Sequence, residues 1–192
     1  MSKKNSNVNL KKIFKNHNNF NKIYIEFKKK LIVSKRKSFC VAISGGPDSL
    51  ALAALAKACS NEKKLKFYYV LINHNIRKNS SLEAKKVKTL LKKHKIYLII
   101  INNKKKIDKN IQSQARKIRY ELLSKFCIKK NVKSILTAHN LEDQVETFFI
   151  RLSRGSGLTG LSSMDYSINL NSKIKLMRPL LSIKKKNLIK IS

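Results

Sequence analysis

The residues best suited to chemistry stand together in the segment 44–49, which reads Ser-Gly-Gly-Pro-Asp-Ser. Its two glycines permit a sharp turn and a close approach of the backbone to a ligand, and its proline suits the first turn of a helix. The exposed backbone N–H groups of such a turn and the positive end of a helix dipole attract an anion such as pyrophosphate, and the serine hydroxyls would add donors. The predicted anion-binding residues are Ser44, Gly45, Gly46, Pro47, Asp48 and Ser49.

The carboxylate of Asp48 would repel a bound phosphate unless a divalent cation lay between the two. We therefore interpret Asp48 as a magnesium ligand rather than as a phosphate contact. The alternative is an ordinary turn between a strand and a helix, in which the glycines only provide geometry. No GxxxxGKS or GxxxxGKT segment is present, which excludes a Walker-type phosphate loop.

Apolar segments on both sides of this turn predict the elements that hold it. The stretch 39–43 favours a strand, and the Leu- and Ala-rich stretch 50–59 favours a helix. Further strands are expected at 65–72, 96–101, 134–138 and 174–177. Further helices are expected at 80–94, 111–129 and 141–155. Apolar strands that alternate with helices indicate a doubly wound α/β fold with a parallel sheet, in which ligands lie beyond the carboxyl ends of the strands.

The helix at 80–94 carries a capping-box pattern formed by Ser80 and Glu83. At the N-terminus, apolar residues recur at helical spacing: Ile23, Tyr24, Phe27, Leu31 and Ile32. We therefore divide the chain into a basic helical extension at 1–36 and an α/β domain at 37–192. No secretory signal is visible and no apolar run reaches the roughly 20 residues that span a bilayer. A cytoplasmic protein is expected, with an organelle stroma or matrix as the alternative.

The composition is strongly basic, because 44 Lys and Arg residues stand against 10 Asp and Glu residues and give a net charge of +34. Such a charge suits a polyanionic partner, and RNA is the obvious candidate. The alternative is compositional drift, since Lys, Asn and Ile are the residues that an AT-rich genome over-supplies. The three cysteines lie far apart without a CxxC pair, which suggests neither a zinc site nor an iron–sulfur cluster.

The segment 44–49 resembles the SGGxDS pyrophosphate loop of the N-type ATP pyrophosphatases, also called the PP-loop superfamily. A second segment, 137–157, reads TAHNLEDQVETFFIRLSRGSG and resembles the TAHHxDDQVET...LRLxRGSG signature of tRNA(Ile)-lysidine synthases. Two positions depart from that signature, since Asn140 replaces a His and Glu142 replaces an Asp. The resemblance implies an adenine nucleotide alpha hydrolase-like fold, with Asp143 as a second magnesium ligand and Arg154 as a stabiliser of charge.

Three shorter segments extend the resemblance from about Phe39 to Leu181. They are 72–77 (INHNIR), 114–120 (QARKIRY) and 178–181 (RPLL). By the resemblance they contribute to a pocket for ATP or another substrate, together with the histidine of the TAHN segment. The pocket residues implied are His74, Arg77, Arg116, Arg119, His139 and Arg178. Asp48, Asp143 and Arg154 would be catalytic.

The family resemblance implies a ligase that uses ATP, Mg²⁺, L-lysine and a tRNA(Ile) with a CAU anticodon. The C2 oxygen of the wobble cytidine would be adenylated, and the ε-amine of lysine would then displace AMP. The product, lysidine, pairs with A rather than G. Two alternatives remain, another PP-loop enzyme of tRNA modification such as a cytidine thiolase, and an RNA-binding relative that has lost catalysis.

Overall fold

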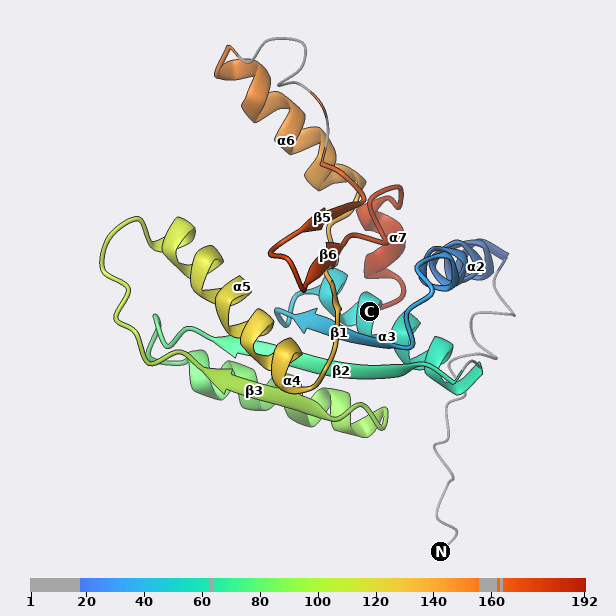
Figure 1. Ribbon diagram of the computed structural model, residues 1–192, viewed down its shortest axis with the longest axis horizontal. Helices are drawn as coiled ribbons and strands as arrows, with labels where there is room; N and C mark the ends of the chain where they lie inside the picture. Colours follow the sequence, from blue (N-terminus) through green and yellow to red (C-terminus); the bar gives the residue numbers. More distant parts are fainter. Residues whose placement is uncertain (1–17, 63, 156–161, 163) are drawn as a thin grey trace, which may run out of the picture.

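A six-stranded, mostly parallel sheet forms the centre of the computed structural model, which describes residues 18–62, 64–155, 162 and 164–192. The strands follow the order β3-β2-β1-β4-β6-β5 (Figure 1). Their bounds are β1 Ser38–Ile43, β2 Lys66–Asn73, β3 Leu98–Asn102, β4 Ser134–Leu136, β5 Ser167–Asn169 and β6 Lys175–Met177. Every neighbouring pair is parallel except β5 and β6. This arrangement confirms the predicted doubly wound α/β fold.

The central strand β1 explains why the sheet is covered on both faces. Phe39 and Val41 belong to one buried cluster, whereas Cys40 between them belongs to the other. Neighbouring side chains of a strand point to opposite faces, so a strand that is apolar throughout needs a helical layer on each side. Both residues flanking Cys40 are fully buried, as is Cys40 itself.

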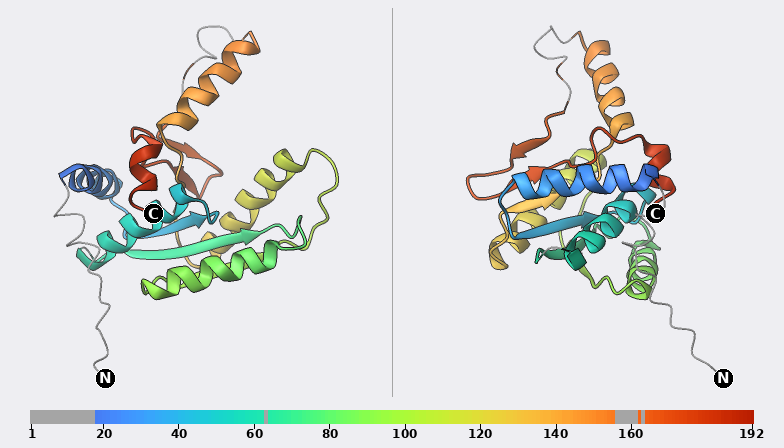
Figure 2. Two further views of the ribbon diagram at one scale, coloured as in Figure 1. Left: turned by 180° about the vertical axis from the view of Figure 1, so that it is seen from behind. Right: turned by 90° about the vertical axis from the view of Figure 1, so that its right-hand side faces the viewer.

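The helices divide between these two faces. Helices α2 (Asn18–Val33), α3 (Pro47–Glu62), α4 (Ser80–Lys93) and α7 (Lys185–Ile189) supply buried residues to one cluster, and α5 (Ile111–Lys129) supplies the other. Helix α6 (Leu141–Ser153) buries none of its residues and projects away from the sheet (Figures 1 and 2). None of the helices in the described ranges is long and apolar enough to cross a membrane.

The N-terminal helix is confirmed as α2, and four of the five predicted apolar residues are buried while Ile32 is exposed. It packs into the same cluster as β1 and α3, and the boundary at residue 36 stays a prediction. Polar contacts also join α2 to the rest of the fold, because the Lys30 ammonium donates to the Pro179 carbonyl at 2.9 Å and to Ser182. The same ammonium donates to Glu26 within the helix. Residues 1–17 of the predicted extension lie outside the described residues.

The capping box predicted for Ser80 and Glu83 is wrong. Helix α4 begins one residue earlier than that pattern requires, with Asn79 as the N-cap, and the Asn79 side chain makes no capping hydrogen bond. The Glu83 backbone N–H instead donates to the Asn79 carbonyl at 2.9 Å, as an ordinary helical bond. A capping box does exist at the start of α6, where it was not predicted.

Candidate functional site

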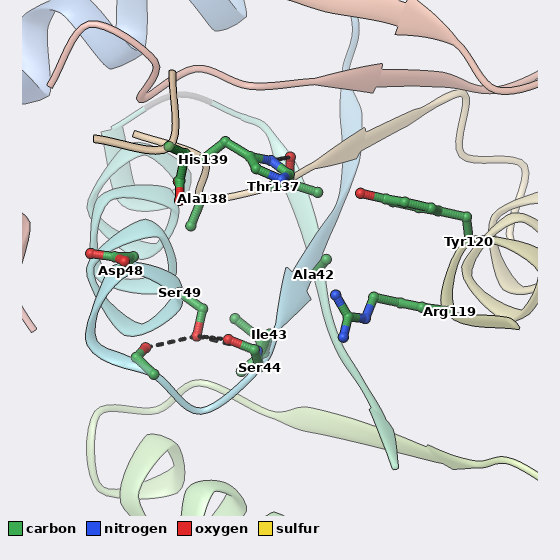
Figure 3. A pocket seen from close by; sticks show the side chains of 12 residues that line it. Ala42, Ile43, Ser44, Asp48, Ser49, Arg119, Tyr120, Thr137, Ala138 and His139 are labelled. Atoms are coloured by element: carbon green, nitrogen blue, oxygen red, sulfur yellow. Dashed lines mark hydrogen bonds between the residues drawn. The ribbon is translucent and has the colours of Figure 1, made fainter. Parts of the chain in front are cut away.

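The predicted loop and the TAHN segment meet where the strand order reverses. Strand β1 pairs with β2 on one side and with β4 on the other, so the connections leaving β1 and β4 diverge at their carboxyl ends. Such a switch point is the usual ligand crevice of an open α/β sheet. A cavity of about 190 Å³ opens there (Figure 3). Its lining is Ala42, Ile43, Ser44, Gly46, Asp48, Ser49, Arg119, Tyr120, Thr137, Ala138, His139 and Asp143.

The loop after β1 is organised by the buried hydroxyl of Ser49. This oxygen accepts hydrogen bonds from the backbone N–H groups of Ser44 at 3.2 Å and Gly45 at 3.1 Å, and it donates to the Gly46 carbonyl at 2.8 Å (Figure 3). The Ser44 hydroxyl also donates to it at 3.2 Å. Ser49 therefore shapes the loop from within, whereas the sequence predicted a hydroxyl that donates to the ligand. Ser44, Gly46 and Ser49 all line the cavity.

Glycine is required at position 45 for two reasons. Its φ of +89° lies in the region that side chains disfavour, and a Cβ built there would stand 2.9 Å from Cγ2 of Val87 on α4. Helix α4 thus packs directly against the loop, which fixes the loop between two helices.

Asp48 occupies the first turn of α3, and its Oδ1 is buried without a hydrogen-bond partner in the part of the chain that the structure describes. Burial raises the pKa of this carboxyl, and the nearby carboxylates of Asp143 and Glu142 raise it further. Lys185 and the Asn140 amide oppose that shift. A buried carboxylate oxygen without a partner, in a cavity that a second carboxylate also lines, is an arrangement that a divalent cation would satisfy.

The first turn of α6 brings Asp143 to the cavity. Asn140, which is 0% exposed, caps this helix, because its side chain accepts from the Asp143 backbone N–H at 3.2 Å. In return, Oδ2 of Asp143 accepts from the Asn140 backbone N–H at 2.8 Å. Oε2 of Glu142 accepts a hydrogen bond from the Lys185 backbone N–H at 2.8 Å. Both residues that depart from the family signature, Asn140 and Glu142, therefore have hydrogen-bond partners.

His139 lies between β4 and α6, and its Nδ1 is 2.9 Å from the Thr137 hydroxyl (Figure 3). Burial lowers the pKa of His139 to about 4, and the positive charge of Arg178 lowers it further. Asp143 opposes this shift, and Arg116 and Arg119 add smaller contributions that lower the pKa. The imidazole is therefore neutral at pH 7.

A second cavity of about 220 Å³ follows the end of β2 and shares Ile43, Ser44 and Arg119 with the first. His74 and Arg77 line it, as predicted from the INHNIR segment. Both ring nitrogens of His74 are buried without hydrogen-bond partners in the described ranges, and burial with the charge of Arg119 lowers its pKa. The Arg119 guanidinium points from α5 toward Ser44, at the junction of the two cavities (Figure 3).

Three of the predicted arginines do not line either cavity. Arg116 is exposed and lies over the Tyr120 ring, 5.3 Å from its centroid. Arg178 is buried, and its Nη1 donates to the Asp165 carbonyl at 2.7 Å. Arg154 caps the far end of α6, about 16 Å from Asp143 along the helix. Its role at the site stays a prediction, and residues 156–161 of the predicted Gly/Ser loop lie outside the described residues.

Lys185 was not singled out from the sequence, although its charge is the largest single influence that lowers the pKa of Asp48. The residue belongs to a run of three lysines in which spacing alone marks none as special. Two hydrogen bonds bring it near the site, one from its own N–H to Glu142 and one from the Leu141 N–H to the Ile183 carbonyl at 3.0 Å.

Comparisons with known proteins agree with this geometry. The sequence model of the PP-loop domain matches residues 5–192. The tRNA(Ile)-lysidine synthase of Wolbachia pipientis wMel is 44% identical over 153 residues, which cover 78% of this chain and 35% of that protein. The enzyme of the same name from Orientia tsutsugamushi (strain Boryong) is 40% identical over 151 residues, covering 78% and 34%. The chain thus spans about a third of the length of these relatives.

Solved structures share the fold. A U34-tRNA thiolase from Methanococcus maripaludis, with its 4Fe–4S cluster, superposes with a TM-score of 0.72 at 18% identity, covering 89% of this chain and 62% of that one. An NMN synthetase from Francisella tularensis superposes with a TM-score of 0.55 at 13% identity, covering 89% and 66%. At these identities the likeness concerns the fold alone.

Proposed function

We propose that this chain, which belongs to the PP-loop domain family, is the ATP-using domain of a tRNA(Ile)-lysidine synthase. The observation that carries the proposal is the identity of 44% and 40% to two proteins of that name over 78% of the chain. The cavity at the switch point supports it, because the loop, the neutral histidine and two carboxylates converge there. About two thirds of the length of each relative lies outside the matched region.

In the proposed reaction, the C2 oxygen of the wobble cytidine attacks the α-phosphorus of ATP and pyrophosphate leaves. The ε-amine of lysine then attacks C2 of the adenylated cytidine, and AMP leaves. The loop 44–49 would hold the phosphates at the N-terminus of α3, where the helix dipole is positive. Ser49 contributes by keeping the loop in shape before ATP arrives.

Asp48 and Asp143 would hold a magnesium ion at this site. The orphaned Oδ1 of Asp48 and the presence of Asp143 in the same cavity lining support this assignment. When bound, the ion supplies positive charge to the phosphates of ATP. The carboxylates themselves have to be ionised to bind it, which the raised pKa of Asp48 opposes and Lys185 favours.

We assign His139 to substrate contact rather than to proton transfer. A general base works best when its pKa is near the working pH, and the pKa of His139 is about 4. Arg119, at the junction of the two cavities, is suited to contact a phosphate or ribose, and His74 and Arg77 would border the nucleoside.

The two alternatives are less well supported. The three cysteines do not form a cluster-binding group, because Cys40 and Cys127 are buried in one core and Cys59 in the other. A catalytically inactive RNA-binding relative would not need Asp48 and Asp143 to face one cavity. The departures at Asn140 and Glu142 do not argue for it, since both residues make hydrogen bonds that shape the site.

The test is to incubate the protein with ATP, Mg²⁺ and labelled lysine, with tRNA(Ile) bearing a CAU anticodon or with tRNA(Met). Lysine incorporation into the first tRNA, with release of AMP and pyrophosphate, is expected. Incorporation into neither tRNA would contradict the proposal. Incorporation of sulfur from a sulfur donor in place of lysine would favour the thiolase alternative.

A further inference from the structure

Asn73 is the buried last residue of β2, and its side chain joins three segments of the chain. Its Nδ2 donates to the Asn102 side chain at 3.1 Å, at the end of the neighbouring strand β3, and to the Ser81 hydroxyl at 3.1 Å, in the first turn of α4. Its Oδ1 accepts from the Asn75 backbone N–H at 3.1 Å. Only 4% of Asn73 is exposed. Both the donor and the acceptor atoms of this buried amide are therefore occupied within the protein.

A second asparagine completes the network in the loop after β2. Asn75 has a left-handed backbone with a φ of 54°, a conformation that asparagine tolerates better than most residues. Its Oδ1 accepts from the Ser81 hydroxyl at 3.3 Å, and its Nδ2 donates to the Asn103 carbonyl at 3.3 Å. The Asn103 backbone N–H in turn donates to the Asn73 carbonyl at 2.8 Å. The loop is thus bonded both to the chain that follows β3 and to the first turn of α4.

This network encloses the two residues that the loop contributes to the second cavity. His74 lies between the bonded residues Asn73 and Asn75, and Arg77 lies between Asn75 and Ser81. His74 and Arg77 line the cavity together with the two asparagines. The ring nitrogens of His74 have no partner in the described ranges, so they are open to a molecule in the cavity. The hydrogen bonds on both sides of His74 determine where its backbone places the ring.

We propose that Asn73 is a positioning residue, which holds His74 and Arg77 where they contact the nucleoside of a nucleotide bound in the second cavity. Asn73 acts through these neighbours, because its own polar atoms already have partners. The inference rests on the proposed function, which places the nucleoside of ATP beside His74 and Arg77. It deepens that function by naming the residue that sets the shape of the nucleoside end of the site.

Two substitutions separate this role from simple packing. Leucine has the branched outline of asparagine but no hydrogen-bonding atoms, so Asn73→Leu releases Asn75, Ser81 and Asn102 together. Aspartate has only acceptors, yet all three partners can donate to it. The Asn75 N–H already does so, the Ser81 hydroxyl can rotate, and the Asn102 amide can turn over. Asn73→Asp should therefore preserve the loop.

The first experiment measures binding of AMP and of pyrophosphate to the full chain by calorimetry, at a temperature where every variant is folded. AMP carries the nucleoside, whereas pyrophosphate requires only the loop 44–49. In Asn73→Leu the Kd for AMP should rise about 3–10-fold, while pyrophosphate should bind as in wild type. Asn73→Asp should bind both ligands as wild type does.

The matched control is Asn103→Leu. This change removes another buried asparagine, whose side chain bonds the Lys105 backbone, and it leaves the backbone bonds of Asn103 in place. Its melting temperature should fall, because a buried amide is lost, but its affinity for AMP should not change. A merely structural role for Asn73 predicts the same behaviour in Asn73→Leu.

The second experiment asks whether Asn73 acts through the two cavity residues. His74→Ala and Arg77→Ala are combined, and Asn73→Leu is then added to that double variant. Binding of a non-cleavable ATP analogue with Mg²⁺ is measured, because its phosphates keep the affinity within range. If Asn73 positions His74 and Arg77, the added substitution should change the Kd by less than about 2-fold in this background.

Three results would overturn the proposal. One is wild-type affinity for AMP in Asn73→Leu, or a chain that binds no AMP at all. Another is an equal loss of pyrophosphate affinity, which would mean that the substitution loosens the whole site. The third is an equal loss of affinity for the ATP analogue with and without His74 and Arg77.

The outcomes also separate this inference from the proposed function. If the wild-type chain transfers no lysine but Asn73→Leu still weakens AMP binding through His74 and Arg77, the lysidine synthase proposal fails and the role of Asn73 stands. If lysine is transferred and Asn73→Leu binds AMP as wild type does, the proposed function stands and the role of Asn73 is wrong.

Discussion

At the scale of single residues, the site concentrates negative charge in a chain whose net charge is +34. Asp48, Glu142 and Asp143 are three of only ten acidic residues. Asn140 bonds to Asp143 and the Lys185 backbone bonds to Glu142, so both of the α6 carboxylates have hydrogen-bond partners. Burial and the other two carboxylates raise the pKa of Asp48, and a bound cation would offset both effects by stabilising the ionised carboxylate.

Asp48→Ala should reduce lysine incorporation by about 100-fold or more, because it removes a proposed metal ligand from the phosphate site. Melting temperature should change little, since Asp48 has an unpaired oxygen rather than a stabilising partner. Asp108→Ala is the matched control, as Asp108 is exposed in the loop after β3. Wild-type activity in Asp48→Ala would contradict the metal role.

His139 should make the folded state sensitive to acid. Its pKa is about 4 in the folded chain and about 6.5 when free, so the unfolded state binds the extra proton as the pH falls from 6.5 toward 4. Stability from this group is present above pH 6.5 and is lost over that interval, by about 1–3 kcal/mol after allowance for partial exposure. Denaturant unfolding of wild type and His139→Gln at several pH values measures the difference. Parallel curves for the two proteins would show that the histidine titrates normally.

Lys185→Ala should move the acid limb of the activity profile to higher pH. Lys185 lowers the pKa of Asp48, so its removal raises that pKa and leaves less ionised carboxylate at a given pH. The pH dependence of kcat/KM for Lys185→Ala is compared with that of Lys186→Ala, which changes the neighbouring exposed lysine. Identical profiles in the two variants would mean that Lys185 does not act on the site.

At the scale of elements, the local sequence pattern predicts the central strands and the loop after β1, but it does not predict the short elements β5 and α7. Strands β1, β2 and β3 are apolar and long enough to be recognised, and their observed bounds differ from the predicted ones by one or two residues. Strand β5 has only three residues, Ser-Ile-Asn, and helix α7 has five. Both were missed because pairing with β6 and burial of Leu188 form them, rather than any local periodicity.

The same distinction applies to the site. Asp48, His139 and Asp143 could be predicted because each follows directly on the end of an apolar strand or opens the next helix. Lys185 could not, because its role depends on Glu142 and Asp48, which are distant in sequence. Asn140 and Asp143 do carry a capping signal, since a good N-cap residue stands three positions before an acidic one.

Gly45→Ala tests how tightly the loop is held between elements. The substitution forces alanine into a φ of +89° and brings its Cβ within 2.9 Å of Val87, so a loss of about 1–3 kcal/mol in unfolding free energy is expected. Adding Val87→Ala should relieve the contact but not the backbone strain, and should therefore recover only part of the loss. Chemical denaturation of the two single variants and the double variant measures this. Full recovery would show that the steric contact alone demands glycine.

At the scale of the whole molecule, the placement of the lysines on the fold bears on whether the net positive charge serves RNA binding. The carboxyl ends of the parallel strands form the edge that carries the site, and the loop 103–110 continues from that end of β3 with exposed lysines. The opposite edge also carries exposed lysines, at the end of α4 and before β2. If the charge arose by compositional drift, the lysines at the two ends of the sheet should contribute equally to RNA binding. If the charge serves RNA binding at the site, the lysines at the carboxyl ends of the strands should contribute more.

Affinity for tRNA should fall steeply with salt, because each phosphate contact releases counterions, and 6–10 contacts would cost about 10³–10⁵ in affinity between about 50 and 200 mM salt. Changing Lys104, Lys106 and Lys109 to Gln should lower the slope of log Kd against log salt by about 2–3, since these lysines lie on the edge of the site. Changing Lys64, Lys92 and Lys93 removes the same charge from the opposite edge and should leave the slope nearly unchanged. Equal slopes in the two triple variants would mean that the basic charge acts as a diffuse field, as drift predicts. A Kd that does not depend on salt in the wild-type chain would exclude an electrostatic role in RNA binding altogether.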